Sequence, residues 1–123
     1  MADYRAPLAD IDFTLNHIVD LASIAKLNDF QHADPETVRG VLEEAARFFE
    51  QVMAPLNVVG DREGSRLDED GQVRTPRGFR EAYAKFTDAG WGAAHITQEW
   101  GGGGLPYAVG IVLQEMFKSA NMA

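Results

Sequence analysis

The chain has 123 residues, of which 46 % are hydrophobic and 24 % charged, and this composition excludes a wholly disordered chain. Its 19 acidic and 11 basic side chains give a formal net charge of -8, which argues against nucleic acid or an anionic membrane surface as a partner. It has no cysteine, so disulfides, thiolate zinc sites and a cysteine nucleophile are excluded. Neither a signal peptide nor a membrane-spanning segment is visible, which predicts a cytoplasmic protein.

The first apolar pattern predicts a helix from about Asp10 to Leu27, with Asp10 as its N-cap. One helical face collects the residues Ile11, Leu15, Ile18, Val19 and Ala22. Three more apolar residues lie outside that face, namely Phe13, Leu21 and Ile24. Because this helix is apolar on more than one side, we expect it to be buried on several sides or to meet a partner.

The second apolar pattern predicts a helix that begins at Asp34, an N-cap residue followed by Pro35 at the first helical position. Apolar residues then recur every three or four positions between Val38 and Leu56. Pro55 has no amide hydrogen to donate, so we expect the helix to kink or end there.

The polar segment from Gly60 to Gln72 has the composition of a solvated loop. Its oxygen-bearing side chains are Asp61, Glu63, Ser65, Asp68, Glu69 and Asp70. A calcium loop that began at Asp61 would need glycine at position 6 and glutamate at position 12, where Arg66 and Gln72 stand. We therefore predict a solvated loop without calcium, followed by a short extended piece at Val73 and Arg74.

A third helix is predicted to begin at Thr75, with Pro76 at its first position, and to be followed by Gly90 in the left-handed conformation. One side of this helix carries Phe79, Tyr83 and Phe86. The segment from Trp91 to Trp100 is expected to be irregular or extended.

Four consecutive glycines, Gly101 to Gly104, predict a flexible turn before a helix that starts at Leu105-Pro106. Pro106 stands where the third glycine of a Gly-x-Gly-x-x-Gly motif belongs, so we interpret the turn as structural rather than as a phosphate site. The last helix carries the apolar residues Val109, Val112, Leu113, Met116 and Phe117. It has no stop signal before Ala123, which indicates a domain cut from a longer protein.

Residues that could carry chemistry are present but poorly arranged in the sequence. The histidines His17, His32 and His95 lack metal-ligand spacing, and Ser23, Ser65 and Ser119 lack a Gly-x-Ser-x-Gly context. The acidic pairs Glu43-Glu44 and Asp61 with Glu63 have the character of exposed carboxylates. We therefore predict no catalytic, cofactor-binding or metal-binding residue in this chain.

Several short motifs nevertheless follow one another in a distinctive order. They are Ala54-Pro55-Leu56-Asn57, Gly60-Asp61, Glu63-Gly64, Thr75-Pro76-Arg77-Gly78-Phe79, Gly90-Trp91, Glu99-Trp100-Gly101-Gly102-Gly103-Gly104-Leu105-Pro106, Gln114-Glu115-Met116 and Ser119-Ala120-Asn121-Met122-Ala123. This order resembles the N-terminal helical domain of an FAD-dependent acyl-CoA dehydrogenase. Tyr4-Arg5-Ala6-Pro7-Leu8 and Phe13 resemble the N-terminal extension of the longer bacterial type.

The resemblance implies an all-α fold of about four main helices with a long polar loop. Residues 1–33 would form an extension helix, and residues 34–123 the family's N-terminal helical domain, cut at its C-terminal end. It also implies a parent enzyme that uses FAD to remove two hydrogens from the α and β carbons of an acyl-CoA substrate. The flavin contacts and the glutamate base of this family lie in its later domains, so we expect no FAD on this chain alone.

In the parent enzyme, by this resemblance, the domain would form one wall of the substrate cavity. Gly103 departs from the family pattern, which has a larger residue there, and predicts a turn without fixed geometry. We also expect a homodimer through apolar helix faces, formed by Phe13, Leu21, Ile24, Ile111, Met116, Phe117 and Met122. The alternative function is a free-standing, non-catalytic helical interaction module.

Overall fold

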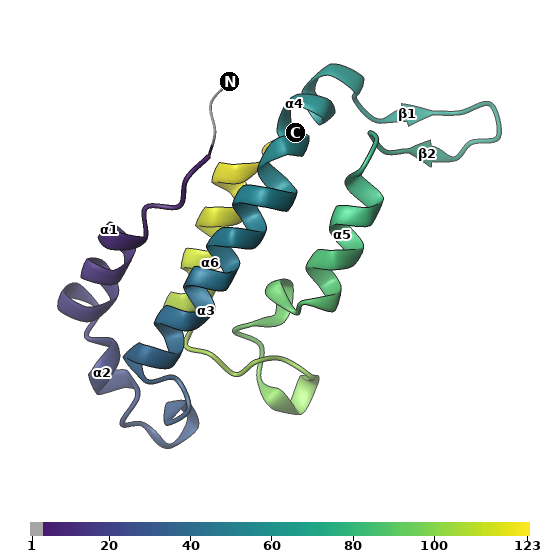
Figure 1. Cartoon of the computed structure of the whole chain (residues 1–123). Coiled ribbons are helices and arrows are strands. Elements are labelled where there is room, and N and C mark those ends of the chain that lie inside the picture. Colours follow the sequence, from purple (N-terminus) through teal and green to yellow (C-terminus); the bar gives the residue numbers. More distant parts are fainter. Residues whose placement is uncertain (1–3) are drawn as a thin grey trace.

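A long helical column stands at the centre of the molecule, which a computed structural model describes for residues 4–123 (Figure 1). The column consists of α3 (Pro35–Phe48), a π-helical turn (Phe49–Met53) and α4 (Ala54–Glu63). A second long helix, α6 (Tyr107–Ala120), packs behind it and contacts both α3 and the π-helical turn. The predicted all-α class is therefore confirmed.

Shorter elements flank this pair of helices on opposite sides (Figure 1). On one side lie α1 (Leu8–Phe13), a π-helical turn (Thr14–Ile18) and α2 (Leu21–Ile24), and on the other lies α5 (Phe79–Asp88). Short 3-10 turns occupy Asn28–Phe30, Trp91–Ala93 and Gln98–Trp100. The two turns after α5 agree with the irregular segment predicted between Trp91 and Trp100.

A small antiparallel ribbon projects beyond α4 and α5 (Figure 1). Its strands β1 (Arg66–Leu67) and β2 (Val73–Arg74) pair Arg66 with Arg74 and Leu67 with Val73. The extended piece predicted at Val73 and Arg74 is confirmed. The predicted loop is too long, because α4 continues as far as Glu63.

α3 begins where the sequence predicts. One carboxylate oxygen of Asp34 accepts hydrogen bonds from the amides of Glu36 at 3.0 Å and Thr37 at 3.1 Å. The other accepts the Thr37 hydroxyl at 2.6 Å. These bonds satisfy amide groups that the first helical turn leaves free, and they hold the pKa of Asp34 below its ordinary value.

The column does not end at Pro55. The amide of Ala54 bonds to the carbonyl of Phe49, five residues earlier, so the helix widens into a π-helical turn just before the proline. Pro55 then stands at the start of α4, where prolines are tolerated. The sequence predicts that the helix kinks or ends at Pro55. The helix does not end there, because a π-helical turn connects α3 to α4.

The predicted helix from Asp10 to Leu27 is wrong in its extent and continuity. The first helix begins at Leu8, and the chain breaks at Asp20, which adopts a left-handed conformation with φ 58°. The Asp20 carboxylate accepts the amide and hydroxyl of Ser23 and so caps α2, which lowers the pKa of Asp20. Asp10 lies in the first turn of α1 instead of capping it.

This break changes which residues face the interior. Ile18 is 70 % exposed and Ala22 is exposed, although both belong to the predicted buried face. Leu21, predicted to lie outside that face, is 1 % exposed. The π-helical turn and the left-handed residue rotate the following side chains, so a single helical period cannot describe the segment.

α5 begins three residues later than predicted, at Phe79 instead of Pro76. The residue before it is Gly78, with φ 84°, and a Cβ there would stand 2.9 Å from a methyl carbon of Leu56. Glycine is therefore required at this position both for the backbone and for close packing. The left-handed Gly90 after α5, with φ 75°, is confirmed.

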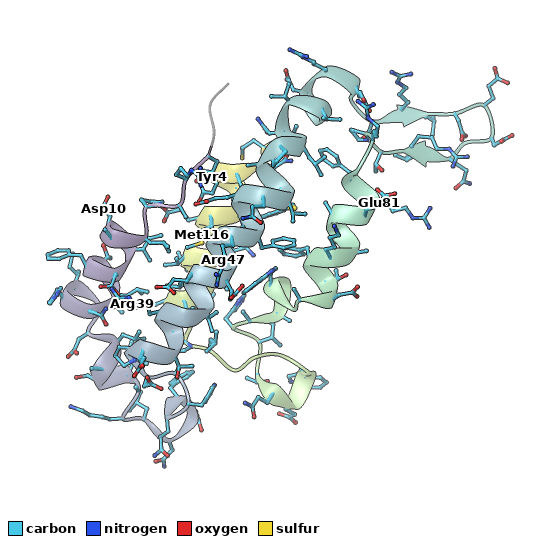
Figure 2. All side chains as sticks on the ribbon, in the orientation of Figure 1. Tyr4, Asp10, Arg39, Arg47, Glu81 and Met116 are labelled. Atoms are coloured by element: carbon cyan, nitrogen blue, oxygen red, sulfur yellow. The ribbon has the colours of Figure 1, made fainter. Side chains whose placement is uncertain are left out.

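The core lies between the column, α6 and the two flanks. Its largest fully buried side chains are Leu21, Val38, Phe49, Val109 and Met116. Around Phe49, the rings of Phe48, Phe86, Trp91 and Phe117 form a cluster with centroid separations between 5.2 and 6.4 Å. Met116 of α6 lies in the core, whereas Arg47 of α3 and Glu81 of α5 are exposed (Figure 2).

Candidate functional site

An apolar cavity of about 340 Å³ lies between the column, α5 and the end of α6. Met53 and Leu56 line it from the column, and Phe117 lines it from α6. From α5 it is lined by Phe79, Ala82 and Tyr83, and from the chain end by residues 121–123. A cavity of this size falls within the range of small-molecule pockets.

Two glycines let α4 and α5 approach closely enough to enclose this cavity. A Cβ on the buried Gly60 would stand 2.6 Å from Cζ of Phe79. A Cβ on Gly78 would meet Leu56 on the same side. Larger residues at either position would therefore move a side chain that lines the cavity.

The end of α6 closes the cavity with a set of amide contacts. The helix stops at Ala120, because Asn121 takes an extended conformation, which corrects the expectation of a helix running to Ala123. The Asn121 side chain donates to the carbonyl of Met53 at 3.0 Å. The Asn57 side-chain oxygen accepts the amides of Met122 at 2.9 Å and Ala123 at 3.2 Å.

The lining decides what this cavity can do. None of its lining residues is an acid, a histidine, a lysine or an arginine, and its one ionisable group is the Tyr83 phenol. Tyr83 is 65 % exposed and stands at the rim. The cavity can therefore hold an apolar group and keep water away from it, but it offers no general acid or base at neutral pH.

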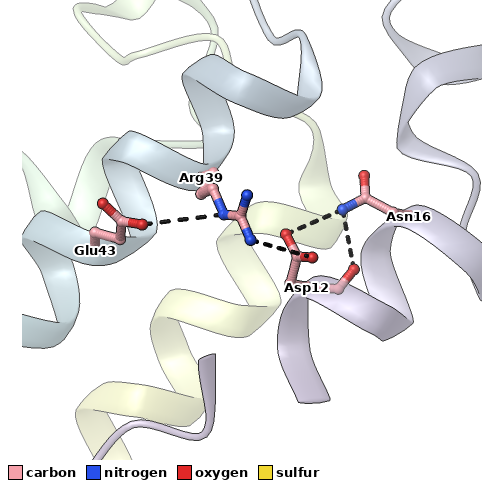
Figure 3. Close-up of polar contacts among 4 residues, drawn as sticks. All are labelled: Asp12, Asn16, Arg39 and Glu43. Atoms are coloured by element: carbon pink, nitrogen blue, oxygen red, sulfur yellow. Dashed lines mark hydrogen bonds and ion pairs between the residues drawn. The ribbon is translucent and has the colours of Figure 1, made fainter. Parts of the chain in front are cut away.

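A second hollow, of about 220 Å³, lies where α1 meets α3, and Figure 3 shows the polar contacts made by its lining residues Asp12, Arg39 and Glu43. Arg39 is 3.7 Å from the Asp12 carboxylate and 4.0 Å from the Glu43 carboxylate, and Asn16 donates to Asp12. The Arg39 side chain is 61 % exposed, so these ion pairs contribute little free energy. This cluster is a surface contact between α1 and α3.

Four of the carboxylates singled out in the sequence, those of Glu43, Glu44, Glu63 and Asp68, bind neighbouring groups. Glu43 and Glu44 are exposed and pair with Arg39 and Arg47 respectively. Asp68 accepts the amides of Asp70 and Gln72 and the guanidinium of Arg74, and these bonds hold its pKa below the ordinary value. Among residues 4–123, no three His, Asp or Glu side chains are grouped to hold a metal ion.

The Gly101–Gly104 turn is not flexible, contrary to prediction. The amides of Gly102, Gly103 and Gly104 donate to the carbonyls of Thr97, Ala93 and Ile96. A Cβ on Gly102 would stand 2.1 Å from the Ile96 carbonyl oxygen, and one on Gly103 would stand 2.8 Å from that of Ala94. The turn therefore has a fixed geometry that needs its glycines.

The same geometry tests whether the turn could hold a flavin phosphate. Phosphate cradles use backbone amides that point at the ligand, and here those amides already bond to carbonyls. The turn therefore does not fit a phosphate group. The Gly103 carbonyl instead faces Nε2 of His32, 3.2 Å away.

The three histidines lie in separate surroundings. His17 lies against the ring of Phe13, with centroids 5.0 Å apart. His95 lies edge-on to Tyr107 and packs on Gly110, where a Cβ would stand 2.6 Å from the imidazole. His17 and His32 are exposed, and only His95 is partly buried, so the structure does not bring the three imidazoles together.

The N-terminal segment is attached to the π-helical turn Phe49–Met53 in a way that the sequence pattern does not indicate. Glu50 accepts the amide of Ala6 at 2.9 Å and the guanidinium of Arg5 at 2.9 Å. Tyr4 packs beside them (Figure 2), and burial, with the nearby carboxylates of Glu50 and Glu115, raises the pKa of its phenol. These contacts join segments more than forty residues apart, which periodicity cannot detect.

Comparison with known proteins shows which enzymes this helical domain resembles. No family model matches the chain. It is 38 % identical over 120 residues to 3-methylmercaptopropionyl-CoA dehydrogenase of Ruegeria pomeroyi. It is 30 % identical over 124 residues to the broad-specificity linear acyl-CoA dehydrogenase FadE5 of Mycobacterium tuberculosis.

These alignments cover 98 % and 100 % of the chain but 20 % of each relative, so the chain spans about one fifth of their length. The fold class is an all-α helical domain. The resemblance found in the sequence is confirmed: the chain is related to the acyl-CoA dehydrogenases and corresponds to their N-terminal helical domain. Within residues 4–123, no helix combines the length and apolar character needed to cross a membrane.

Proposed function

We propose that this chain serves a flavin-dependent acyl-CoA dehydrogenase and forms part of the wall of its substrate cavity. The observation that carries this proposal is the apolar cavity between α4, α5 and the end of α6. Its lining binds and shields an apolar group but transfers no proton. In the whole enzyme, FAD and a base from other domains would supply the α,β-dehydrogenation of the thioester.

We also propose a division at Asp34, with residues 1–33 as an extension and residues 34–123 as the helical domain. The cap at Asp34 starts a new helix, and the preceding segment makes polar contacts with α3 through Asp12 and with the π-helical turn through Arg5. The Arg5 and Arg39 side chains of these ion pairs are exposed, so the extension is held largely by its apolar residues, such as Ile11 and Leu15.

A cytoplasmic homodimer completes the proposed function. The absence of cysteine suits a reducing compartment. Leu21 and Met116 are buried within the chain and cannot contribute to a dimer surface. The exposed members of the predicted apolar faces are Phe13, Ile111 and Met122.

The test is to express the reading frame that encodes this chain, together with all coding sequence continuous with it. We expect a yellow protein that reduces an artificial electron acceptor only when an acyl-CoA is present. A reading frame that stops at Ala123 and gives a colourless, inactive protein would support the non-catalytic interaction module instead. A flavoprotein that reduces the acceptor with other substrates and never with acyl-CoA would contradict the proposed substrate class.

A further inference from the structure

The tip of the projecting ribbon carries the one Asp-Gly pair of the sequence, Asp70-Gly71, and the sequence has no Asn-Gly pair. Both residues are exposed, and Gly71 has φ 74° with nothing within 4 Å of the place where a Cβ would stand. The Gly71 nitrogen therefore has no side chain beside it that would hinder its approach to the Asp70 carboxyl group.

The two aspartates of this turn differ in how their carboxylates are held. The Asp68 carboxylate accepts hydrogen bonds from the amides of Asp70 and Gln72 and pairs with Arg74. Within the part of the chain that the structure describes, no donor bonds to the Asp70 carboxylate. Asp70 is therefore free to rotate its side chain toward Gly71, whereas Asp68 is fixed.

The turn must open before the Asp70 side chain can react with the next amide. In the closed turn the Gly71 amide donates to the carbonyl of Asp68 at 3.0 Å. The strands that support the turn have two residues each, all exposed, and isolated two-stranded ribbons are only marginally stable. Their pairing also sets Arg66 directly opposite Arg74, which places like charges together. The ribbon can therefore open while the core stays folded.

We propose that Asp70 is a site of spontaneous isoaspartate formation, and that Asp68 is a positioning residue that slows the reaction by holding the turn closed. First, the Gly71 nitrogen bonds to Cγ of the protonated Asp70 carboxyl group, and one carboxyl oxygen leaves as water with the amide hydrogen. Water then opens the resulting succinimide ring. Breaking the new bond from nitrogen to Cγ restores aspartate, whereas breaking the original peptide bond routes the main chain through Cγ. No atom is gained or lost overall, and nothing is oxidised or reduced.

The product changes the ribbon because isoaspartate adds one methylene group to the main chain between two bonded amides. The amide of Asp70 donates to the side chain of Asp68, and the amide of Gly71 donates to its carbonyl. A longer backbone between these amides cannot keep both bonds in their present geometry. The pairing of Leu67 with Val73 then loses the turn that sets its register.

The experiment incubates the full, folded chain in neutral buffer and digests samples with trypsin over several weeks. Cleavage after Arg66 and Arg74 releases the peptide Leu67–Arg74, which contains both aspartates of the turn. Its isoaspartyl form has the same mass but elutes separately, and electron-based fragmentation identifies the modified position. We expect isoaspartate to accumulate at Asp70 and not at Asp68. The Asp70→Glu variant cannot close the five-membered ring and should show no second peak.

The Asp68→Ala variant tests whether the closed turn limits the rate. Loss of its bonds should speed isoaspartate formation at Asp70 about fivefold, the effect of one net hydrogen bond on the opening equilibrium. The matched control is Glu69→Ala, because the Glu69 side chain is exposed and forms no ion pair among residues 4–123. It should keep the original rate. Circular dichroism checks folding, and where Asp68→Ala does not fold, the original chain in urea below its unfolding transition should show the same acceleration.

A synthetic peptide with the sequence of residues 67–74, incubated beside the chain, gives the rate for an open turn. Two results would overturn the modification site: no isoaspartate in the folded chain by the time the free peptide is largely converted, or as much isoaspartate at Asp68 as at Asp70. An equal rate in folded Asp68→Ala and the original chain or, where that variant does not fold, in the chain with and without urea, would overturn the role of Asp68. None of these outcomes depends on acyl-CoA oxidation by the longer reading frame, so the proposed function is tested separately.

Discussion

Gly60 of α4 and Phe79 of α5 are in such close contact that a Cβ on the glycine would stand 2.6 Å from Cζ of the ring and 2.7 Å from the Cβ of Ala123. Three parts of the chain therefore meet at one glycine. In the sequence, Gly60 looks like the first residue of a loop. In the structure, it is a buried helical residue whose missing side chain makes room for two other elements.

Replacing this glycine should destabilise the fold. Gly60→Ala forces Phe79 and the chain end to move, which we expect to lower the free energy of unfolding by about 1–3 kcal/mol. The matched control is Gly40→Ala in α3, where a Cβ would meet nothing within 4 Å. That change should raise the free energy of unfolding by ~0.5–1 kcal/mol through helix propensity, and urea denaturation measures both. Equal stability of the two variants would show that position 60 is not tightly packed.

The Asp34 cap predicts a stability difference that depends on pH. Its hydrogen bonds lower the pKa of Asp34 in the folded protein, so the carboxylate contributes its full stability above its ordinary pKa of 3.8. This contribution is lost as the pH falls through the lower folded-state value. The Asp34→Ala variant should therefore melt below the original chain at pH 7, and the gap between the two melting temperatures should narrow as the pH falls below 3.8. A difference in melting temperature that stays constant over this range would contradict a charged cap.

Calcium should not stabilise the ribbon that joins α4 to α5. Asp68 already accepts hydrogen bonds from two amides and from Arg74, and Glu63 binds Arg77. A ligand at ~100 times its dissociation constant adds about 2.7 kcal/mol to stability, which raises the melting temperature by several degrees. We expect no such rise with millimolar calcium chloride, with magnesium chloride as the control for ionic strength. A rise specific to calcium would show that these carboxylates exchange their protein partners for the ion.

The homodimer predicts a specific mass in solution. Light scattering should give about 27 kDa, twice the chain mass of 13.5 kDa. Ile111 is 48 % exposed on α6, and Ile111→Glu should return the mass to that of one chain because burying an unpaired carboxylate is costly. Leu67→Glu on the ribbon, outside the helix faces, should leave the dimer intact. A monomer in the unmodified chain would refute the proposed assembly.

Local chemistry made some elements predictable from the sequence. The start of α3 follows from Asp34 and Pro35, and the end of α5 follows from Gly90, because each depends on residues within one turn. The family resemblance also came from short motifs in a fixed order. These signals require no knowledge of distant contacts.

Other elements depend on partners far away in the chain. Asp20 takes a left-handed conformation that non-glycine residues rarely adopt, and no local pattern indicates it. The glycine turn is fixed by carbonyls of the preceding loop and contacts His32, 71 residues before Gly103. Four consecutive glycines predict a flexible backbone, whereas hydrogen bonds to the preceding loop hold this backbone in one conformation.

The cavity was the least predictable feature. Its walls come from α4, α5 and the end of α6, and each contributes only a few residues. Met53 and Leu56 belong to a regular apolar pattern that indicates burial but not an unfilled space. The informative signal was Gly60 beside an aromatic residue of another helix, and this pairing becomes visible only after folding.

The aromatic cluster around Phe49 gives the protein two tryptophans of opposite optical character. Trp91 lies among phenylalanine rings, whereas Trp100 is 79 % exposed at the end of its 3-10 turn. Emission from the folded chain therefore combines a blue-shifted component from Trp91 with a water-like component from Trp100. Acrylamide quenches the second component first, so the fluorescence of Trp91 reports separately on the opening of the interior.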